Sequence, residues 1–296
     1  MKTSARSLYI LAISNIAYGL LPITVKLANR MHYSPVEETF LRFVFALLGI
    51  LILWSTGLQR LTLVNRQALF WRGVFGSLSI LAYFVALQTT SSGKGTLLNY
   101  TYILWTNVFA VMFFGQKPPR RFFWFLLLAS VGIDLVLDVR WDHLNWGDLA
   151  GLISGITGGA AVLAIKRVRY TDTALTDFTS LSLFGFVLSG CALLGGGSMA
   201  ISTNHASVWT TPDLWGGLAL IGIGATAMMG QLLFSETIGH MSLALGTLLA
   251  LAVPVLAALF GWIFLGEPLT PHFLVGMVFV LTACGAMIWQ ENQNQA

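Results

Sequence analysis

The chain has 296 residues, of which 56% are hydrophobic and 9% are charged, and its mean hydropathy is +0.77. A soluble domain carries roughly 25% charged residues, so this composition excludes a water-covered surface and predicts an all-α integral membrane protein. The formal net charge of +4 does not indicate nucleic-acid binding, because the basic residues stand at the ends of apolar runs and form no folded basic face.

Apolar runs that are separated by Gly, Pro and charged residues predict ten membrane-spanning helices of about 20 residues each. In chain order the predicted spans are 7–29, 35–56, 67–88, 95–114, 121–139, 146–166, 176–195, 212–234, 243–265 and 270–289. The first run is interpreted as a retained span, because it is too long for the apolar part of a signal peptide and has no clear cleavage site.

The basic residues predict the orientation of these spans. With the N-terminus in the cytoplasm, most of the 16 Lys and Arg residues fall in cytoplasmic segments, namely Lys2, Arg6, Arg60, Arg66, Arg72, Lys117, Arg120, Arg121, Lys166, Arg167 and Arg169. The remainder lie outside or near the outer ends, namely Lys26, Arg30, Arg42, Lys94 and Arg140. The positive-inside rule therefore predicts that both termini are cytoplasmic, which an even number of spans allows.

Two segments of the chain repeat each other about half a length apart. The letters GTLL begin at Gly95 and again at Gly246, an offset of 151 residues between these positions. At the same offset Phe109 and Gly115 meet a second Phe and Gly. The start of each half also matches, with Ile13, Ser14, Ile16, Gly19 and Lys26 meeting Ile153, Ser154, Ile156, Gly159 and Lys166.

This repetition predicts two copies of one five-helix unit, in residues 1–140 and 141–296. Because five is an odd number of spans, the second copy must enter the membrane from the opposite side. Inverted repeats are typical of secondary transporters, in which the substrate site lies near the midplane between the two halves. We therefore expect ten transmembrane helices in two inverted five-helix repeats.

The segments SSGKGTLLNY and LGEPLTPHFLVGMVFVLTACG carry a resemblance to a known family. With ten spans in two halves, the chain resembles the EamA-type branch of the drug/metabolite transporter superfamily over nearly its whole length. The first half departs from the pattern, because Gln and Lys at 116–117 stand where the second half has Glu267 and Pro268, and Ile103 replaces the proline seen as Pro254. The resemblance implies export or exchange of small metabolites across a bacterial inner membrane, with no single substrate.

Arg42 is the leading candidate for substrate binding, because a charged residue inside a span usually faces a partner or a water-filled cavity. Glu38 precedes it by four residues on the same helix face. One interpretation is that Arg42 binds a substrate carboxylate or phosphate, with Glu38 as its partner or as a proton-linked counter-ion. The alternative is a structural ion pair near the outer interface, with Arg42 extending towards the headgroups.

Further polar and aromatic residues in apolar runs are predicted to line the same site. In the fourth span, Asn99, Tyr102 and Thr106 share one helical face, whereas Trp105 fits either the lining or an interfacial aromatic belt. The other predicted substrate-binding residues, taken from separate spans, are Asn15, Tyr18, Tyr83 and Gln231. Hydrogen bonding between helices is the alternative role for each of them. Together they favour amphiphilic solutes such as amino acids or nucleobase-like compounds.

These observations predict a secondary transporter that moves small organic metabolites by alternating access, with export as the expected direction. The alternatives are an uncoupled channel or facilitator, and an intramembrane enzyme, for which no nucleophile, paired-Asp or metal-binding motif is evident. We expect no enzymatic activity, no cofactor, no metal and no nucleic-acid partner. Proton coupling through Glu38 and a monomeric or homodimeric state stay open.

Overall fold

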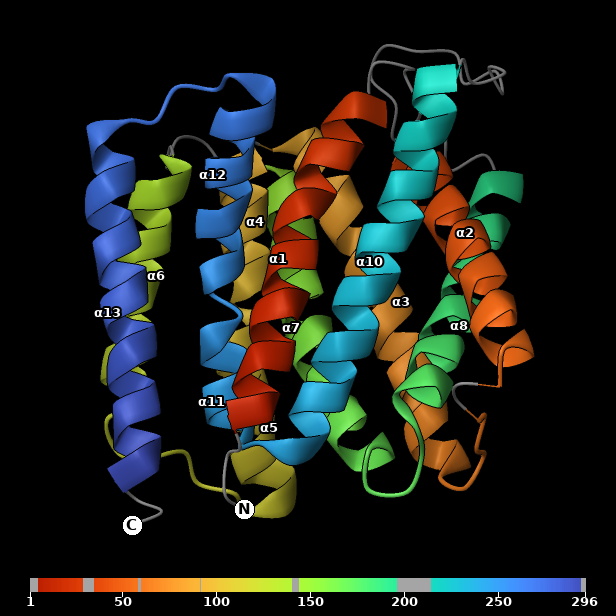
Figure 1. Cartoon of the computed structure of the whole chain (residues 1–296), viewed down its shortest axis with the longest axis horizontal. Helices are drawn as coiled ribbons and strands as arrows, with labels where there is room; N and C mark the ends of the chain where they lie inside the picture. Colours follow the sequence, from red (N-terminus) through yellow and green to blue (C-terminus); the bar gives the residue numbers. More distant parts are fainter. Residues whose placement is uncertain are drawn as a thin grey trace.

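The computed structural model describes residues 5–28, 35–57, 60–90, 92–139, 144–195 and 214–293. Within these ranges the chain forms α-helices joined by turns and contains no strand, as predicted. The helices stand side by side as a bundle, with the start of α1 and the end of α13 at the same end (Figure 1).

Within the described residues, each half of the chain contains six helical segments. The first half contains α1 (Ala5–Ala28), α2 (Pro35–Ser55), α3 (Arg66–Thr89), α4 (Ser92–Tyr100), α5 (Tyr102–Phe114) and α6 (Phe122–Leu137). The second half contains α7 (Trp146–Val168), α8 (Ala174–Leu194), α10 (Leu214–His240), α11 (Leu243–Leu249), α12 (Ala252–Leu265) and α13 (Pro271–Gln293).

Eight segments of the described chain are long and apolar enough to cross a membrane, with α4–α5 and α11–α12 each forming one span. The helix α6 is a shorter apolar helix of 16 residues. The helix α2 has 21 residues and carries Glu37, Glu38 and Arg42 in its first two turns. The chain is therefore a multi-pass membrane protein, and the total of ten spans stays a prediction.

Two of the predicted spans are broken helices. The second-half break lies between Leu249 and Ala252, where Pro254 cannot donate a backbone hydrogen bond and its ring would clash with the carbonyl of Ala250. The first-half break lies at Thr101 and has no proline. There the Thr101 hydroxyl donates to the Leu98 carbonyl over 2.6 Å, which offers that carbonyl an alternative to the helical hydrogen bond.

Helix contacts follow a two-fold pattern between the halves. The helix α1 packs on α10 and α12, and its counterpart α7 packs on α3 and α5. The pairs α2–α8 and α6–α13 join each helix to its own counterpart. Helices α1 and α7 run in opposite directions through the bundle (Figure 1). This arrangement supports the predicted inverted repeat.

The same relation holds for individual hydrogen bonds. The Ser14 hydroxyl donates to the Gly230 carbonyl over 2.7 Å, and the Ser154 hydroxyl donates to the Ser79 carbonyl over 2.8 Å. Ser14 and Ser154 are the serines that match in the sequence repeat, and Gly230 follows Ser79 at the offset that relates Gly95 to Gly246. Two equivalent hydrogen bonds therefore connect α1 to α10 and α7 to α3.

Glycines allow α6 and α13 to meet closely where they cross. A Cβ atom added to Gly132 would lie 2.7 Å from the Gly276 carbonyl oxygen and 2.9 Å from the Phe279 Cβ. A Cβ atom added to Gly276 would in turn collide with the Gly132 carbonyl oxygen. Because backbone atoms cannot move aside easily, this crossing requires small residues, as close helix packing in lipid usually does.

We expect Gly132→Ala to destabilise the protein by about 1–3 kcal/mol, the usual cost of overpacking. The midpoint of thermal unfolding in detergent measures this effect. Gly285→Ala is the matched control, because a Cβ atom at Gly285 meets nothing within 4 Å. An equal loss of stability in both variants would contradict the proposed role of the crossing.

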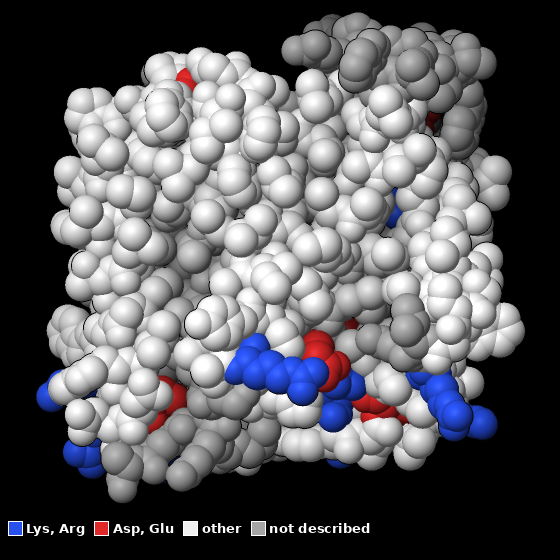
Figure 2. All heavy atoms as spheres, viewed as in Figure 1, with Lys and Arg blue, Asp and Glu red and all other residues white. Residues whose placement is uncertain are grey.

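Most of the described basic residues lie at the end of the bundle that holds the start of α1 and the end of α13, which we call the basic end. They are Arg6, Arg60, Arg66, Lys117, Arg120, Arg121, Arg167 and Arg169, in the first turn of α1, in the connections between helices or in the helix turns next to them. Figure 2 shows Lys and Arg side chains along this lower edge. The side chains of Lys2, Lys26, Arg30 and Arg140 lie outside the described residues.

Arg72 corrects one detail of the charge prediction. It lies within α3 instead of a connecting segment, is 2% exposed, and pairs with Asp177. A buried cation inside a helix is held by its partner and is poor evidence for orientation.

Candidate functional site

Four tyrosines from four helices form a polar cluster within the bundle, which we call the tyrosine cluster. They are Tyr18 on α1, Tyr83 on α3, Tyr100 at the end of α4 and Tyr102 at the start of α5. Tyr100 interacts electrostatically with the other three hydroxyls, and its ring centroid lies 5.8 Å from that of Tyr102. The break at Thr101 therefore places two phenols next to each other.

Arg42 of α2 faces the tyrosine cluster. It is 7% exposed and interacts electrostatically with Tyr18 and Tyr83. Within the described part of the chain, no hydrogen bond or ion pair joins its guanidinium to another residue. A buried cation without a protein partner is costly, so this group is suited to bind an anionic ligand group.

Glu38 does not pair with Arg42 among the described residues. Its side chain is buried, and its Oε1 atom has no hydrogen-bond partner. The predicted pair on one helix face is therefore two ionisable side chains that do not contact each other in this structure.

Tyr18 and Gln231 are brought together as predicted. The Tyr18 hydroxyl donates to Gln231 Oε1 over 2.7 Å, which links α1 to α10. One turn earlier on α1, Asn15 Nδ2 donates to the Leu249 carbonyl over 2.9 Å, at the break between α11 and α12. Asn15 Oδ1 is buried and without a partner. Asn15 therefore supports the broken helix and keeps a free acceptor.

The remaining predicted residues are divided between the cluster and the surrounding helix contacts. The Tyr83 hydroxyl is 3.0 Å from Thr96 Oγ1. Asn99 donates to the Ser154 hydroxyl of α7 over 2.5 Å, and the Trp105 ring is tilted against that of Phe109 with the centroids 5.9 Å apart. The break at Thr101 also separates Asn99 from Tyr102, so these two residues do not share one continuous helix.

Two buried ion pairs were not predicted from the sequence. Lys94 Nζ lies 2.7 Å from Asp148 Oδ2, and Arg72 Nε lies 3.0 Å from Asp177 Oδ1. Both pairs join the first half to the second. Asp177 follows Glu38 at an offset of 139 residues between these positions, so comparing the halves would have singled it out.

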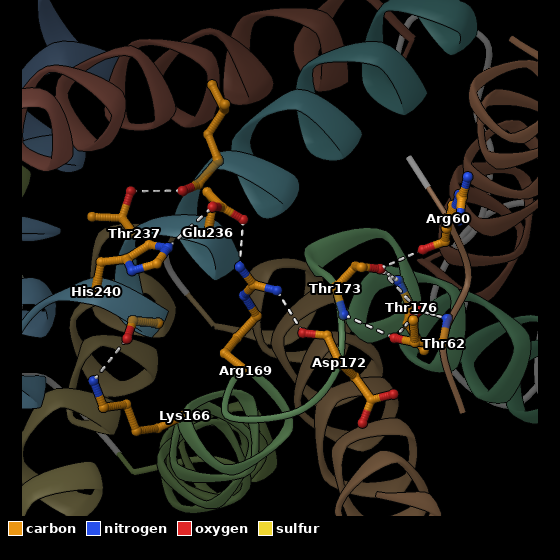
Figure 3. A network of polar contacts seen from close by, with 12 residues as sticks. Arg60, Thr62, Lys166, Arg169, Asp172, Thr173, Thr176, Glu236, Thr237 and His240 are labelled. Carbon is orange, nitrogen blue, oxygen red and sulfur yellow. Dashed lines mark hydrogen bonds and ion pairs between the residues drawn. The ribbon is translucent and has the colours of Figure 1, made fainter. Parts of the chain in front are cut away.

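A network of polar contacts joins segments from both halves at the basic end (Figure 3). Arg169 pairs with Glu236 of α10 at 2.5 Å and donates to the Asp172 carbonyl over 2.6 Å. The Thr176 hydroxyl accepts the Thr62 N–H over 2.8 Å. The end of α7 and its connection to α8 are therefore bound to α10, and the first turn of α8 is bound to the connection before α3.

The EamA-like transporter family model matches residues 6–137 and 145–289, once for each half. The chain belongs to the EamA-like transporter family. It is 23% identical over 249 residues to the pseudopaline exporter CntI of Pseudomonas aeruginosa PAO1, covering 83% of this chain and 84% of that protein. It is 26% identical over 246 residues to the threonine/homoserine exporter RhtA of Escherichia coli K12, covering 83% and 79%.

A solved structure shares this fold with a TM-score of 0.77 at 16% identity, covering 99% of each chain. The family membership and the exporters among its relatives point to a transporter and not an enzyme. The hydrogen bond from Tyr18 to Gln231 joins the tyrosine cluster of the first half to α10 of the second half.

Proposed function

We propose that this protein exports small zwitterionic metabolites of the amino-acid type across the bacterial inner membrane by alternating access. The observation that carries the proposal is Arg42, a buried cation without a described protein partner beside the tyrosine cluster. A substrate carboxylate would accept hydrogen bonds from the planar guanidinium, whose geometry matches it. The phenols, Gln231 and the free Asn15 oxygen supply polar partners for an ammonium group.

The architecture supports this mechanism. Ten spans in two inverted repeats, divided near residue 140, would place the broken helices α4–α5 and α11–α12 in equivalent positions, with the site between the halves. Exchange of conformation between the repeats would then open opposite ends in turn. The basic end corresponds to the cytoplasm by the positive-inside rule, which agrees with cytoplasmic termini.

Transport by the purified protein in lipid vesicles tests this function. We expect vesicles that contain the protein to exchange labelled threonine, the substrate named for one relative, and to do so faster than empty vesicles. Mass spectrometry of cells and medium, with and without expression of the chain, then defines the range of exported metabolites. The absence of any exported solute together with no exchange in vesicles would refute the proposal.

A further inference from the structure

Two buried carboxylates of the described chain each keep one oxygen without a hydrogen-bond partner. These oxygens are Oε1 of Glu38 and Oδ2 of Asp177, in residues that are 3% and 0% exposed. Burying an ionised carboxylate oxygen without a hydrogen-bond donor costs roughly several kcal/mol. Such a carboxylate is therefore stable only if its charge is neutralised.

Two other buried carboxylates of the described chain, Asp148 and Asp172, accept hydrogen bonds at both oxygens. Asp148 Oδ1 accepts from Thr90, and its Oδ2 accepts from Lys94 and from the Asn145 N–H. Burial alone would raise the pKa of the Asp172 carboxyl, but hydrogen bonds from the Val64 and Asn65 N–H groups hold that pKa below its ordinary value. Asp148 and Asp172 therefore have structural roles that Glu38 and Asp177 do not share.

Glu38 and Asp177 occupy equivalent positions of the two repeats. Each lies in the first turn of the second helix of its half, since α2 begins at Pro35 and α8 at Ala174. The same buried positions recur along both helices: Val36, Arg42, Phe43, Ala46 and Ile50 in α2 correspond to Leu175, Leu181, Ser182, Gly185 and Ser189 in α8.

The two carboxylates lie towards opposite ends of the bundle. The helix α8 begins at the basic end, where Thr176 meets the connection before α3 (Figure 3). The helix α2 begins at the other end and packs against α8 (Figure 1). Each entrance of the proposed path therefore has one such acid nearby.

The surroundings of the two acids differ. Asp177 has the Arg72 guanidinium of α3 at 3.0 Å and interacts with the Tyr18 hydroxyl of α1. The charged group that acts on Glu38 among the described residues is another acid, Glu37, on the same helix. A guanidinium neutralises Asp177, whereas the neighbours of Glu38 that the structure describes supply no positive charge to neutralise it.

We propose that Glu38 is a proton-binding site, and that it and Asp177 are equivalent acids that must be neutralised before the path closes at their respective ends. The positive charge of Arg72 neutralises Asp177. Glu38 is neutralised by a proton taken up from water, which converts its carboxylate to a neutral carboxyl group. This inference rests on the proposed function for its role in transport. The proton affinity of Glu38 then differs between the open and closed states, which couples proton binding to the conformational change.

Infrared spectroscopy of the full-length protein in lipid tests the proton site without transport. A neutral carboxyl group has a carbonyl stretch band that an ionised carboxylate lacks. We expect this band at neutral pH in the unaltered protein, its loss in Glu38→Gln, and its retention in Glu37→Gln and Asp177→Asn. In Arg72→Met a second band should appear, and the additional change Asp177→Asn should remove it.

Two outcomes would overturn the proposal. One is a carbonyl stretch band that remains in Glu38→Gln, and the other is the loss of this band in Asp177→Asn. If Glu38→Gln does not fold, Glu38→Asp serves instead, because it should shift the frequency of the band, and an unshifted band would have the same meaning.

Threonine exchange in vesicles then tests the coupling. We expect its rate to depend on the pH at the end opposite the basic end, with a limiting slope of about tenfold per pH unit for one proton, and Glu38→Gln to abolish this dependence. A pH dependence unchanged in Glu38→Gln would refute the coupling. Expected spectra without transport of any solute would refute the proposed function and leave the proton site standing.

Discussion

Replacement of Arg42 by alanine is expected to lower the rate of threonine exchange by about 30-fold or more. The reason is that losing one member of a buried, charged hydrogen-bonded pair costs about 2 kcal/mol or more. The amount of protein in the membrane should change little, because Arg42 forms no ion pair with the described residues that its removal would break. Initial rates in vesicles, normalised to protein content, measure the effect.

Two further variants define the role of this residue. Arg66→Ala removes the same charge from an exposed position at the start of α3 and should leave exchange unchanged. Arg42→Lys should retain part of the activity if only the charge binds the substrate, and should resemble Arg42→Ala if the planar guanidinium is required. Normal exchange by Arg42→Ala would exclude substrate binding by this residue.

The ion pair between Lys94 and Asp148 is expected to give the largest stability effect. Lys94→Met leaves the carboxylate of Asp148 buried without its cation and should destabilise the protein by about 3 kcal/mol. This value is at the lower end of the range for buried pairs, because both residues lie in the first turn of their helices, near the end of the bundle.

The double variant Lys94→Met/Asp148→Asn should recover most of this loss, since no uncompensated charge remains. Thermal unfolding in detergent compares the single and double variants. The pair of His240 with Glu236 is the control, because its His side chain is 59% exposed and His240→Ala should cost less than about 1 kcal/mol. A double variant no more stable than Lys94→Met would contradict the charge explanation.

Parts of the candidate site could be predicted from the sequence. Arg42, Tyr18, Tyr83, Tyr102 and Gln231 were identifiable as polar groups in apolar runs, where an unsatisfied polar group is costly and therefore needs a partner. Their contacts were not predictable, since the Tyr18 hydroxyl meets a glutamine 213 residues further along the chain, and Arg42 has no hydrogen-bond or ion-pair partner among the described residues. Asn99 illustrates this limit, since its amide binds Ser154 of α7 and helps to join the halves.

The break in the first half shows the same limit for the backbone. Pro254 marks the second break in the sequence, but Ile103 gives no such signal in the first. There the Thr101 hydroxyl binds the Leu98 carbonyl, and Gly155 of α7 allows the two backbones to come close. A threonine within an apolar helix is common, so only the packing of α7 against this point distinguishes it.

The sequence by itself determined that the chain lies in lipid, that it is helical, that its two halves repeat and that it resembles a transporter family. Composition and long apolar runs are sufficient for this, because a membrane requires every backbone polar group to be satisfied within a helix. The tertiary structure alone decided which side chains meet: Arg42 with the tyrosine cluster, Lys94 with Asp148, and Arg72 with Asp177. Helices that are apolar on most faces have no clear amphipathic stripe to fix their rotation, so packing between the halves selects the residues that form the site.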